Sequence, residues 1–496
     1  MARSIVQEPV GSSAKVPVIT NFTPIVPYVV LQDDISGLFY FKWIMEVRYT
    51  NSSGVLIAKV KQRRNGYQAD VDASPERART VFDVRNIVNS ILEDTIVDQN
   101  FTTKTIHKLG ENVAAKILST NYNQLFHIYV KFYEEYATSA DDIPAATPSS
   151  YLEDDRYYIA ASLPLETKRG TDDFQTDAFG QYTQDGSSDF FLSDLPYMYH
   201  AMADTSNKRL VNYVQETDYH TVGFLNQESV FDSECKFFEI VYYNSAGSKI
   251  NEKMYIENNV TNGGWNPDDD STVIDGETVN IANKDRLLYF GCGPGNLEAS
   301  TVNATDTGGT SSGRAKPSNN SGWSHYSIRG CTTSNETTTV YKTYPYYFVK
   351  QEPNCKGYKV RRLAWRNSKG CWDYFNFIQK SVQTIEITRN DYSSLIGSFD
   401  DTMYTYSNID RGKQTRQTEA TLKEVLNTDF INDDQAEFLE SLMVSTNVQI
   451  VENDDTTYTV PVIITDKKFE KKTIANDTLI QYSIAIEYAN PINTNS

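Results

Sequence analysis

Long apolar runs are missing from this 496-residue sequence. No stretch approaches the roughly 18 uninterrupted apolar residues that a membrane-spanning helix needs. The first residues, MARSIVQEPVGSSAKVPVI, contain one arginine but lack the apolar segment of about 7–15 residues that a secretory signal requires. We therefore expect neither a signal peptide nor a membrane partner.

Basic residues are scarce relative to acidic ones. Lys and Arg number 46 against 65 Asp and Glu, which gives a net charge of −19. Such a chain repels a phosphate backbone and offers it no broad positive surface. Binding to nucleic acid is therefore not expected.

Cysteine is also sparse, and its arrangement suggests no metal site. The five cysteines are Cys235, Cys292, Cys331, Cys355 and Cys371. They form no CxxC pair, and no histidine follows at metal-ligand spacing. We predict reduced, buried thiols, with a structural disulfide or a zinc site as the alternatives.

Aromatic and turn-forming residues, in contrast, are abundant. The sequence has 33 Tyr and 23 Phe and is rich in Asn, Thr, Ser and Asp, which favours strands and turns over helices. Residues 38–60 and 236–256 each show two strand-like runs around a turn that ends in glycine, which predicts β-hairpins. We predict a mainly β fold of several β-sandwich or barrel-like modules with a few short helices and long loops.

The predicted organisation has five parts. They are an extended N-terminal arm at 1–20, a β-sandwich domain with a short helix at 21–150, an extended connection with short strands at 151–232, a second β-sandwich domain at 233–380 with a long loop at 298–322, and a C-terminal β domain at 381–496 with one helix at 433–444. The loop is predicted because its segment has almost no apolar side chain to pack. The helix is predicted from one apolar face behind a cap at Asn432 or Asp433, formed by Ala436, Leu439, Leu442 and Met443.

An aromatic hairpin is predicted within 361–381, RRLAWRNSKGCWDYFNFIQKS. On either side of a turn that ends in Gly370, four large apolar residues lie at strand spacing: Leu363, Trp365, Trp372 and Tyr374. We expect these side chains to fill a core. Arg361 and Arg362, at its basic flank, are candidate interaction residues that would pair with the acidic surface of a neighbouring copy.

A glycine-rich stretch at 287–297, LLYFGCGPGNL, resembles the first motif of class I methyltransferases. That motif needs a helix after the glycine turn and an alternation of strands and helices around it. The residues from Glu298 onward do not favour such a helix, so we interpret the stretch as a strand that runs into an irregular turn. No cofactor is expected.

The remaining polar candidates form no recognisable catalytic or metal motif. The five histidines, none within an HExxH motif or beside a GxSxG elbow, are interpreted as surface residues: His107, His127, His200, His220 and His325. The acidic run 268–277 does not match a calcium-binding EF-hand loop, because Val273 stands where the sharp turn needs glycine. We therefore predict no catalytic residue and no metal site.

Trp265 and Trp323 lie in turn-like, polar surroundings. Each is a candidate to stack on a sugar or to insert into a neighbouring subunit. The alternative, which we favour, is that each tryptophan fixes its own loop.

Several segments together resemble a group of poorly characterised virion proteins of tailed bacteriophages. The resemblance is best over the last 140 or so residues and rests on the strand 355–362, the hairpin 365–377, the helix 431–444 and the ending 461–484, with similar elements at 82–88 and 290–297. It implies a structural role in the tail, baseplate or head–tail connector (neck) region. It supplies no catalytic residues.

From this resemblance we expect a non-enzymatic virion protein, assembled in the host cytoplasm. Its expected partners are copies of itself and other virion proteins, contacted through the N-terminal arm, the 298–322 loop and sheet edges. Two alternatives remain. One is a receptor- or glycan-binding tail module that contacts host-surface glycan, and the other is a polysaccharide-degrading enzyme, whose paired carboxylates a sequence does not reveal.

Overall fold

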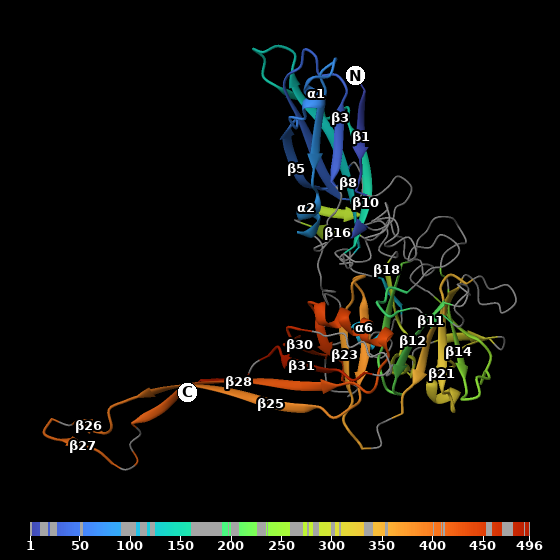
Figure 1. Cartoon of the computed structure of the whole chain (residues 1–496), viewed down its shortest axis with the longest axis vertical. Helices are drawn as coiled ribbons and strands as arrows, with labels where there is room; N and C mark the ends of the chain where they lie inside the picture. Colours follow the sequence, from blue (N-terminus) through green and yellow to red (C-terminus); the bar gives the residue numbers. More distant parts are fainter. Residues whose placement is uncertain are drawn as a thin grey trace. The chain divides into compact units, whose positions relative to one another are not determined.

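The computed structural model describes most of the chain. The described residues are 2–9, 18–19, 27–49, 53–90, 106–109, 117–119, 125–159, 191–196, 198–199, 208–225, 235, 237–257, 271–274, 277–280, 287–298, 303–306, 309–331, 341–352, 356–399, 401–407, 409, 412–452, 459–468, 480–490 and 492–495. The fold is mainly β, with several separate sheets, one of which curls into a half-barrel, and this confirms the predicted class (Figure 1).

Two compact units make up the chain. Unit 1 comprises Met1–Lys350 together with the short segment Asn367–Asp373, and unit 2 comprises Gln351–Arg366 and Tyr374–Ser496. The turn of the aromatic hairpin thus belongs to unit 1, whereas most of its two strands belongs to unit 2. The predicted boundary at 380/381 falls inside unit 2, and the five-part division stays a prediction.

Unit 1 begins with a β-sandwich. Its three-stranded sheet has the order β1 (Arg3–Gln7), β3 (Tyr28–Gln32), β6 (Ala78–Phe82). Its six-stranded sheet has the order β2 (Val18–Ile19), β10 (Leu152–Ile159), β8 (Leu125–Ala137), β4 (Phe39–Tyr49), β5 (Leu56–Arg63), with β9 (Ala145–Ala146) beside β8. Tyr28 and Phe82 of the first sheet contact the ring of Phe132 of the second, with ring centroids 5.2 and 5.6 Å away. One apolar core therefore joins the two sheets.

Sequence alternation explains this sandwich. The predicted hairpin at 38–60 is confirmed as β4 paired with β5. Ile128, Val130 and Phe132 alternate along β8 and are all buried, as their period of two predicts. Within the segment 1–20, which was predicted to be an extended arm, Arg3–Gln7 forms β1. This strand pairs with β3 at an open edge of the three-stranded sheet, so it is not free.

The rest of unit 1 contains three further sheets. The largest has the order β11 (Met198–Tyr199), β12 (Lys208–Val214), β22 (Tyr346–Lys350), β21 (His325–Cys331), β14 (Phe237–Tyr243), β15 (Met254–Glu257), β19 (Asn303–Asp306), β20 (Gly309–Ser312). The others are β13 (Thr221–Leu225), β18 (Leu287–Gly291), β7 (Ile117–Ser119), and the pair β16 (Ser271–Ile274), β17 (Glu277–Asn280). The second predicted hairpin is confirmed as β14 paired with β15.

Among its described residues, unit 1 also has short helices. They are α1 (Gln68–Val71), α2 (Arg85–Asn89), α5 (Pro294–Glu298) and the 3-10 turns η1 (Ile106–Lys108) and η5 (Pro317–Asn320). The first amide of α2, of Arg85, donates to the Asp83 carboxylate at 2.9 Å.

The predicted long loop at 298–322 is wrong. β19, β20 and η5 fall within it, and Tyr242 of β14 donates a hydrogen bond to the carbonyl of the buried Ala315 at 2.9 Å. The Asn320 amide donates to the carbonyls of Arg314 and Lys316. Composition misled because this segment is ordered by backbone and amide hydrogen bonds rather than by apolar side chains.

Unit 2 is built on one sheet. Its order is β24 (Trp372–Phe377), β23 (Arg361–Arg366), β29 (Val448–Ile450), β30 (Val460–Ile464), β31 (Ser483–Tyr488), β28 (Lys413–Asn427), β25 (Val382–Ser393), with β32 (Ile492–Asn495) paired to β28. A further pair is β26 (Ser398–Phe399) and β27 (Tyr404–Thr405). Every residue of β23 is buried, as are Trp372 and Tyr374, so the predicted aromatic core is confirmed.

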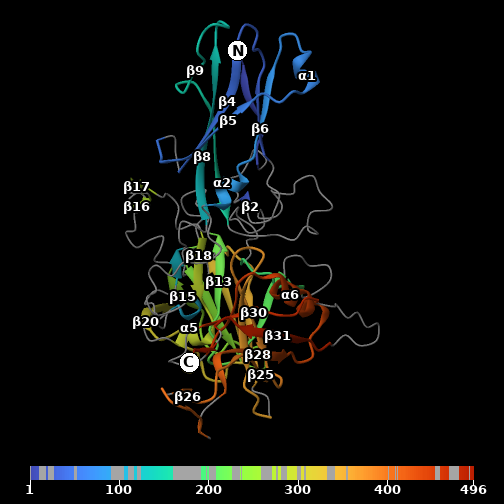
Figure 2. The same cartoon turned by 90° about the vertical axis from the view of Figure 1, so that its left-hand side faces the viewer.

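The helix α6 (Asp433–Val444) has the predicted bounds and packs within unit 2 (Figure 2). Asn432 caps it: its side chain accepts from the Gln435 amide at 2.9 Å, and the Gln435 side chain accepts from the Asn432 amide. Three of the four predicted core residues, Ala436, Leu439 and Leu442, are buried, whereas Met443 is only half-buried. The sequence did not identify Phe438, whose ring lies 4.9 Å from that of Trp365.

Candidate interaction surface

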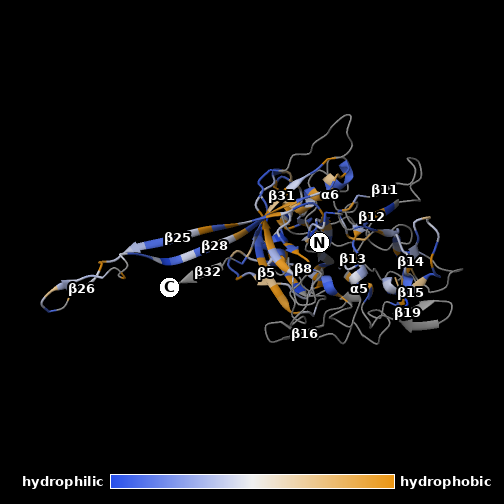
Figure 3. Ribbon diagram, turned by 90° about the horizontal axis from the view of Figure 1, so that it is seen from below, coloured by the Kyte–Doolittle hydropathy of each residue, from blue (hydrophilic) through white to orange (hydrophobic). Residues whose placement is uncertain are grey.

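The long hairpin of β25 and β28 is the most unusual element of unit 2. Twelve residue pairs join the two strands, from Val382 opposite Val425 to Ser393 opposite Lys413, with an irregularity after Asn390. The pair extends away from the sheet and carries β26 and β27 at its far end (Figure 1 and Figure 3). We call the paired residues 382–393 and 413–425 the shaft, and residues 394–412 the tip.

The shaft begins in the core of unit 2. Leu426, just beyond it, is fully buried, and residues 423–427 pair with β31. Glu424 is also buried, and its carboxylate accepts hydrogen bonds from Arg361 at 2.9 Å, from Gln383 at 3.0 Å and from Tyr488 at 2.9 Å. Burial raises the pKa of Glu424, but these donors outweigh it and hold the pKa below its usual value. An ionised, fully partnered carboxylate therefore fixes the root of the hairpin.

The predicted role of Arg361 and Arg362 is wrong. Arg361 pairs with Glu424 and also with Glu452, at 2.7 Å. Arg362 is 2% exposed, donates to Asn376 at 2.7 Å and lies 5.0 Å from the Tyr374 ring centroid. Both cations are used inside unit 2, because a buried charge needs a partner close by. Neither is available to a neighbouring copy.

The shaft exposes apolar side chains on one face beyond its root and on the other face at its root. All twelve residues of β25 are exposed. Opposite residues of an antiparallel pair point to the same face. Ile385 therefore shares one face with Leu422, and Ile387 shares it with Ala420, whereas Val382 and Val425 lie on the other face.

The tip is richer still in exposed apolar side chains. They are Leu395, Ile396, Phe399, Met403, Tyr404, Tyr406 and Ile409. Together, shaft and tip hold 12 of the 23 large apolar side chains that are exposed among the described residues. The clustering of so many on one hairpin is unlike the scattered single residues that are normal on a protein surface.

Backbone geometry constrains two described positions of the tip. Gly397 has a φ of +92°, and a Cβ atom there would overlap the carbonyl oxygen of Thr405. Ser394 donates a backbone hydrogen bond to Gly412 at 2.7 Å, which closes the end of the shaft. Only glycine satisfies both the φ and the space at position 397.

The predicted tryptophan candidates do not form a surface. Trp323 is 5% exposed, and its ring lies 5.5 and 6.2 Å from those of Tyr326 and Tyr242. It fixes its own loop, which was the favoured of the two interpretations. Trp265 lies outside the described residues.

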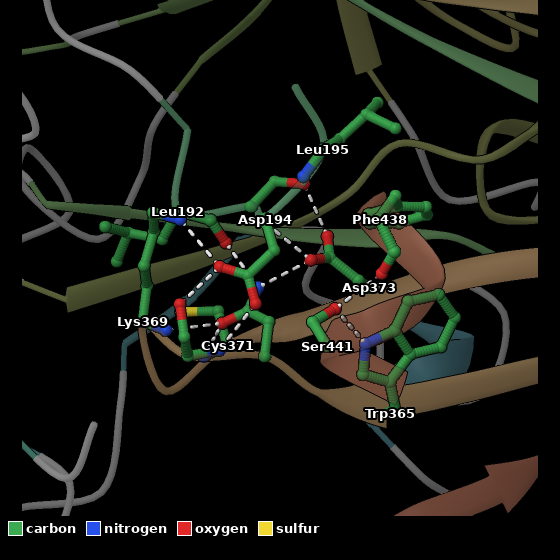
Figure 4. A network of polar contacts seen from close by, with 12 residues as sticks. Leu192, Asp194, Leu195, Trp365, Lys369, Cys371, Asp373, Phe438 and Ser441 are labelled. Carbon is green, nitrogen blue, oxygen red and sulfur yellow. Dashed lines mark hydrogen bonds and ion pairs between the residues drawn. The ribbon is translucent and has the colours of Figure 1, made fainter. Parts of the chain in front are cut away.

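A buried carboxylate pair in unit 1 is the arrangement closest to a catalytic site, and the sequence analysis did not identify it (Figure 4). Asp373 accepts from Ser193 at 2.5 Å, from the Asp194 amide at 2.7 Å and from Asn367 at 3.1 Å. Asp194 accepts from Lys369 at 2.6 Å and from the Ser368 amide at 2.7 Å. Burial, followed by the charge of Asp194, raises the pKa of Asp373 to about 7.

This network holds the turn of the aromatic hairpin. Ser368 and Lys369 belong to that turn, and the Asn367 side chain also donates to the Leu192 carbonyl at 2.9 Å. Each carboxylate is already engaged by donors of the chain itself, and Asp373 is fully buried. We therefore assign the pair a structural role.

The glycine-rich stretch and the described histidines also serve packing. A Cβ at Gly293 or Gly295 would overlap or crowd backbone atoms of residues 217–220, so these glycines permit close contact within the chain. The five-residue helix α5 begins directly after Gly293 and includes Gly295, where an irregular turn was expected. The Asn296 amide at its centre donates to the carbonyls of His107 and Leu109, both at 2.8 Å.

The surface interpretation of the histidines is wrong for two of them. His107 and His220 are buried against aromatic rings, the first against Trp372 and the second against Tyr346 and Phe348. His325 is partly buried and stacks on Tyr243. His200 and the side chain of His127 lie outside the described residues.

Among the described residues, no group of three His, Cys, Asp or Glu side chains is placed to hold a metal ion. Within the same residues, no helix combines the length and apolarity required to span a bilayer. No protein-family model matches the chain, and no curated protein matches its sequence.

Proposed function

We propose that the chain is a non-enzymatic structural component of a tailed-bacteriophage particle, from its tail, baseplate or head–tail connector region. It assembles as a symmetric oligomer with copies of itself and contacts other virion proteins. The particle is built in the host cytoplasm. The β25–β28 hairpin is the single observation that carries this proposal.

Beyond its pairing with β31 and β32, the shaft continues as a two-stranded hairpin, which is marginal in water because it has no face on which to build a core. The shaft and tip nevertheless expose a concentrated set of apolar side chains. Soluble monomers rarely expose such a patch unless it binds a partner. Assembly supplies that partner.

Magnitudes indicate what burial of the tip contributes. Burying one Leu, Ile or Phe side chain contributes roughly 1.5–3 kcal/mol. The seven apolar side chains of the tip would give about 10–20 kcal/mol if fully buried, against the roughly 4–15 kcal/mol that association costs. Burial of the tip by a partner is therefore of the size needed to drive assembly.

Mass spectrometry of purified phage particles tests the proposal. We expect the chain in intact, nuclease-treated particles at a fixed ratio to the major tail and capsid proteins. A host protein of similar abundance serves as the carry-over control. Absence of the chain from particles that infect normally would contradict the proposal.

Neither alternative function gains a specific observation. The glycan-binding alternative relied on Trp265, Trp323 and loop tyrosines as an exposed platform; Trp323 is buried, and Trp265 lies outside the described residues. The polysaccharide-degrading alternative needs paired carboxylates that reach substrate, whereas the carboxylate pair described above is engaged within its own chain.

A further inference from the structure

Lys369 and two aspartates form a charged cluster in the interior of unit 1 (Figure 4). The Lys369 ammonium donates to Oδ1 of Asp194 at 2.6 Å, and the two side chains are only 11% and 10% exposed. Asp373, which accepts the Asp194 backbone amide at 2.7 Å, is fully buried. An amine and a carboxyl group that are held together away from water are placed to condense to an amide, because water is a product of that reaction.

We propose that Lys369 and Asp194 become joined by an isopeptide bond, an amide between the lysine Nζ and the aspartate Cγ. The bond closes residues 195–368 into a covalent loop. This modification goes beyond the proposed function and does not depend on it, because the chain needs no partner to form the bond.

The reacting atoms are within reach of each other. One C–O bond of about 1.2 Å separates Oδ1 of Asp194 from Cγ, so Nζ of Lys369 lies at most about 3.8 Å from that carbon. Reacting atoms that are poised for attack lie about 3–3.5 Å apart. Groups held in this way have effective concentrations of about 10⁵–10⁸ M, which favours condensation over hydrolysis by bulk water.

Ser368 prepares the Asp194 carboxyl group for attack. Its backbone amide donates to the second oxygen, Oδ2, at 2.7 Å, and its hydroxyl donates to Oδ1. When an amine adds to a carboxyl carbon, negative charge develops on the oxygen that stays in the product. A backbone amide at this distance from Oδ2 stabilises that charge, so Oδ2 becomes the amide oxygen and Oδ1 leaves.

Atoms and protons balance without a further reactant. The cluster rests as an ion pair: burial raises the pKa of Asp194, but the charge of Lys369 and the Ser368 donors hold it below its usual value. One proton then passes from the ammonium to Oδ1, which removes both charges from the interior. The Nζ lone pair forms the bond to Cγ, and the bond from Cγ to Oδ1 breaks. A second proton moves from nitrogen to Oδ1, so one water is released and one hydrogen stays on the amide nitrogen.

Asp373 holds the two reacting segments together. Its carboxylate accepts the Asp194 amide at 2.7 Å and the side chain of Asn367, two residues before Lys369, at 3.1 Å. Burial, followed by the charge of Asp194, raises the pKa of Asp373 to about 7. Below neutral pH, Asp373 therefore adds no second negative charge that would keep the proton on Lys369.

A second lysine–carboxylate pair of unit 1 provides a matched control. Lys253 donates to Glu239 at 3.0 Å, and these side chains are 15% and 4% exposed. Among the described residues, the other side chains that donate to Glu239 are the hydroxyls of Tyr255 and Tyr341. A backbone amide like that of Ser368 is not among these donors, so we expect this pair to stay an ion pair.

Intact mass and peptide mapping of the purified full-length chain test the proposal. We expect wild type to be lighter than its unlinked mass by one water, about 18 Da. Trypsin should release a branched peptide that joins residues 170–208 to residues 367–380 through an uncut Lys369. Lys369→Arg, which keeps the positive charge but forms no such amide, and Asp194→Ala should both show the unlinked mass. The control Lys253→Arg should be as light as wild type.

Wild type at its full unlinked mass would overturn the proposal. A mass deficit without the branched peptide, or one that persists in Lys369→Arg, would overturn it as well, because the water would then come from another site. The mass of wild type decides the question even where a variant fails to fold. The chain expressed alone suffices for this experiment, so its failure is distinguishable from absence of the chain in phage particles, which bears on the proposed function.

Discussion

At the scale of single residues, Glu424 has the clearest energetic role in unit 2. Its buried carboxylate accepts from Arg361, Gln383 and Tyr488, and so ties the start of β25 to two other strands. Such a buried cluster stabilises the fold when each of its polar groups has a partner. Removing the charge of Glu424 leaves the buried Arg361 with Glu452 as its remaining charged partner.

We therefore predict that Glu424→Gln lowers the free energy of unfolding by on the order of 3 kcal/mol, because Arg361 loses a charged partner. Urea denaturation at pH 7 measures this change. Glu419→Gln, on the exposed shaft, is the control and should change stability by less than about 0.5 kcal/mol. Equal effects of the two substitutions would contradict the assigned role.

Asp373 should make stability depend on pH. Its folded pKa of about 7 lies above the ordinary value for aspartate, so the folded state binds a proton that the unfolded state releases. Stability should therefore rise as pH falls from about 7 toward 4, and should fall as pH rises through this window. Urea denaturation from pH 5 to pH 8 tests the sign.

Asp373→Asn removes this titration. The free energy of unfolding of the variant should depend less on pH over the same range. Its value should be lower than that of wild type, because Ser193, Asn367 and the Asp194 amide lose the carboxylate that accepts their hydrogen bonds. A slope equal to that of wild type would show that another group titrates.

At the scale of elements, the bounds and the cap of α6 were predictable because their signals are local. The capping box, the apolar face and the length of the helix are all written in consecutive residues. We predict that Asn432→Ala costs about 1 kcal/mol of stability, since the Gln435 amide loses its acceptor. Asn432→Asp, which keeps an acceptor, is the control and should retain wild-type stability in the same denaturation assay.

The β25–β28 hairpin is the opposite case. Residues 383–387 alternate polar and apolar side chains, and nothing in that alternation distinguishes a strand in a sheet from one that leaves it. The prediction of a long loop at 298–322 was wrong for a related reason. The hydrogen bond from Tyr242 to this segment joins residues far apart in the chain, and the composition of the segment does not reveal the bonds within its turns.

At the scale of the whole molecule, the reactivity of the cysteines tests the prediction of reduced, buried thiols and the burial of these residues in the fold. Cys235, Cys292, Cys331 and Cys371 are buried and form no disulfide. Burial, the largest cause, raises the pKa of Cys331 well above its ordinary value, so its reactive thiolate is disfavoured. Gly223 lies so close to Cys371 that a Cβ there would overlap the sulfur.

We predict that these four thiols react with Ellman's reagent only after unfolding. The folded protein should release at most one equivalent rapidly, and five equivalents should appear in concentrated urea without reductant. Cys355→Ser isolates the four described thiols and should abolish any rapid phase. Rapid release of two or more equivalents from folded protein would contradict the burial of these sites.

The sequence by itself determined the mainly β class, the hairpins at 38–60 and 236–256, the buried aromatic strands around Gly370 and the helix α6. These features depend on periodicity and capping, which act between residues close together in the chain. Only the tertiary structure decided that Arg361 and Trp323 are internal, that Asp194 meets Asp373, and that β25 and β28 extend from the sheet with both faces exposed. Burial and charge pairing join residues far apart in the chain, and for this reason neither composition nor local pattern specifies them.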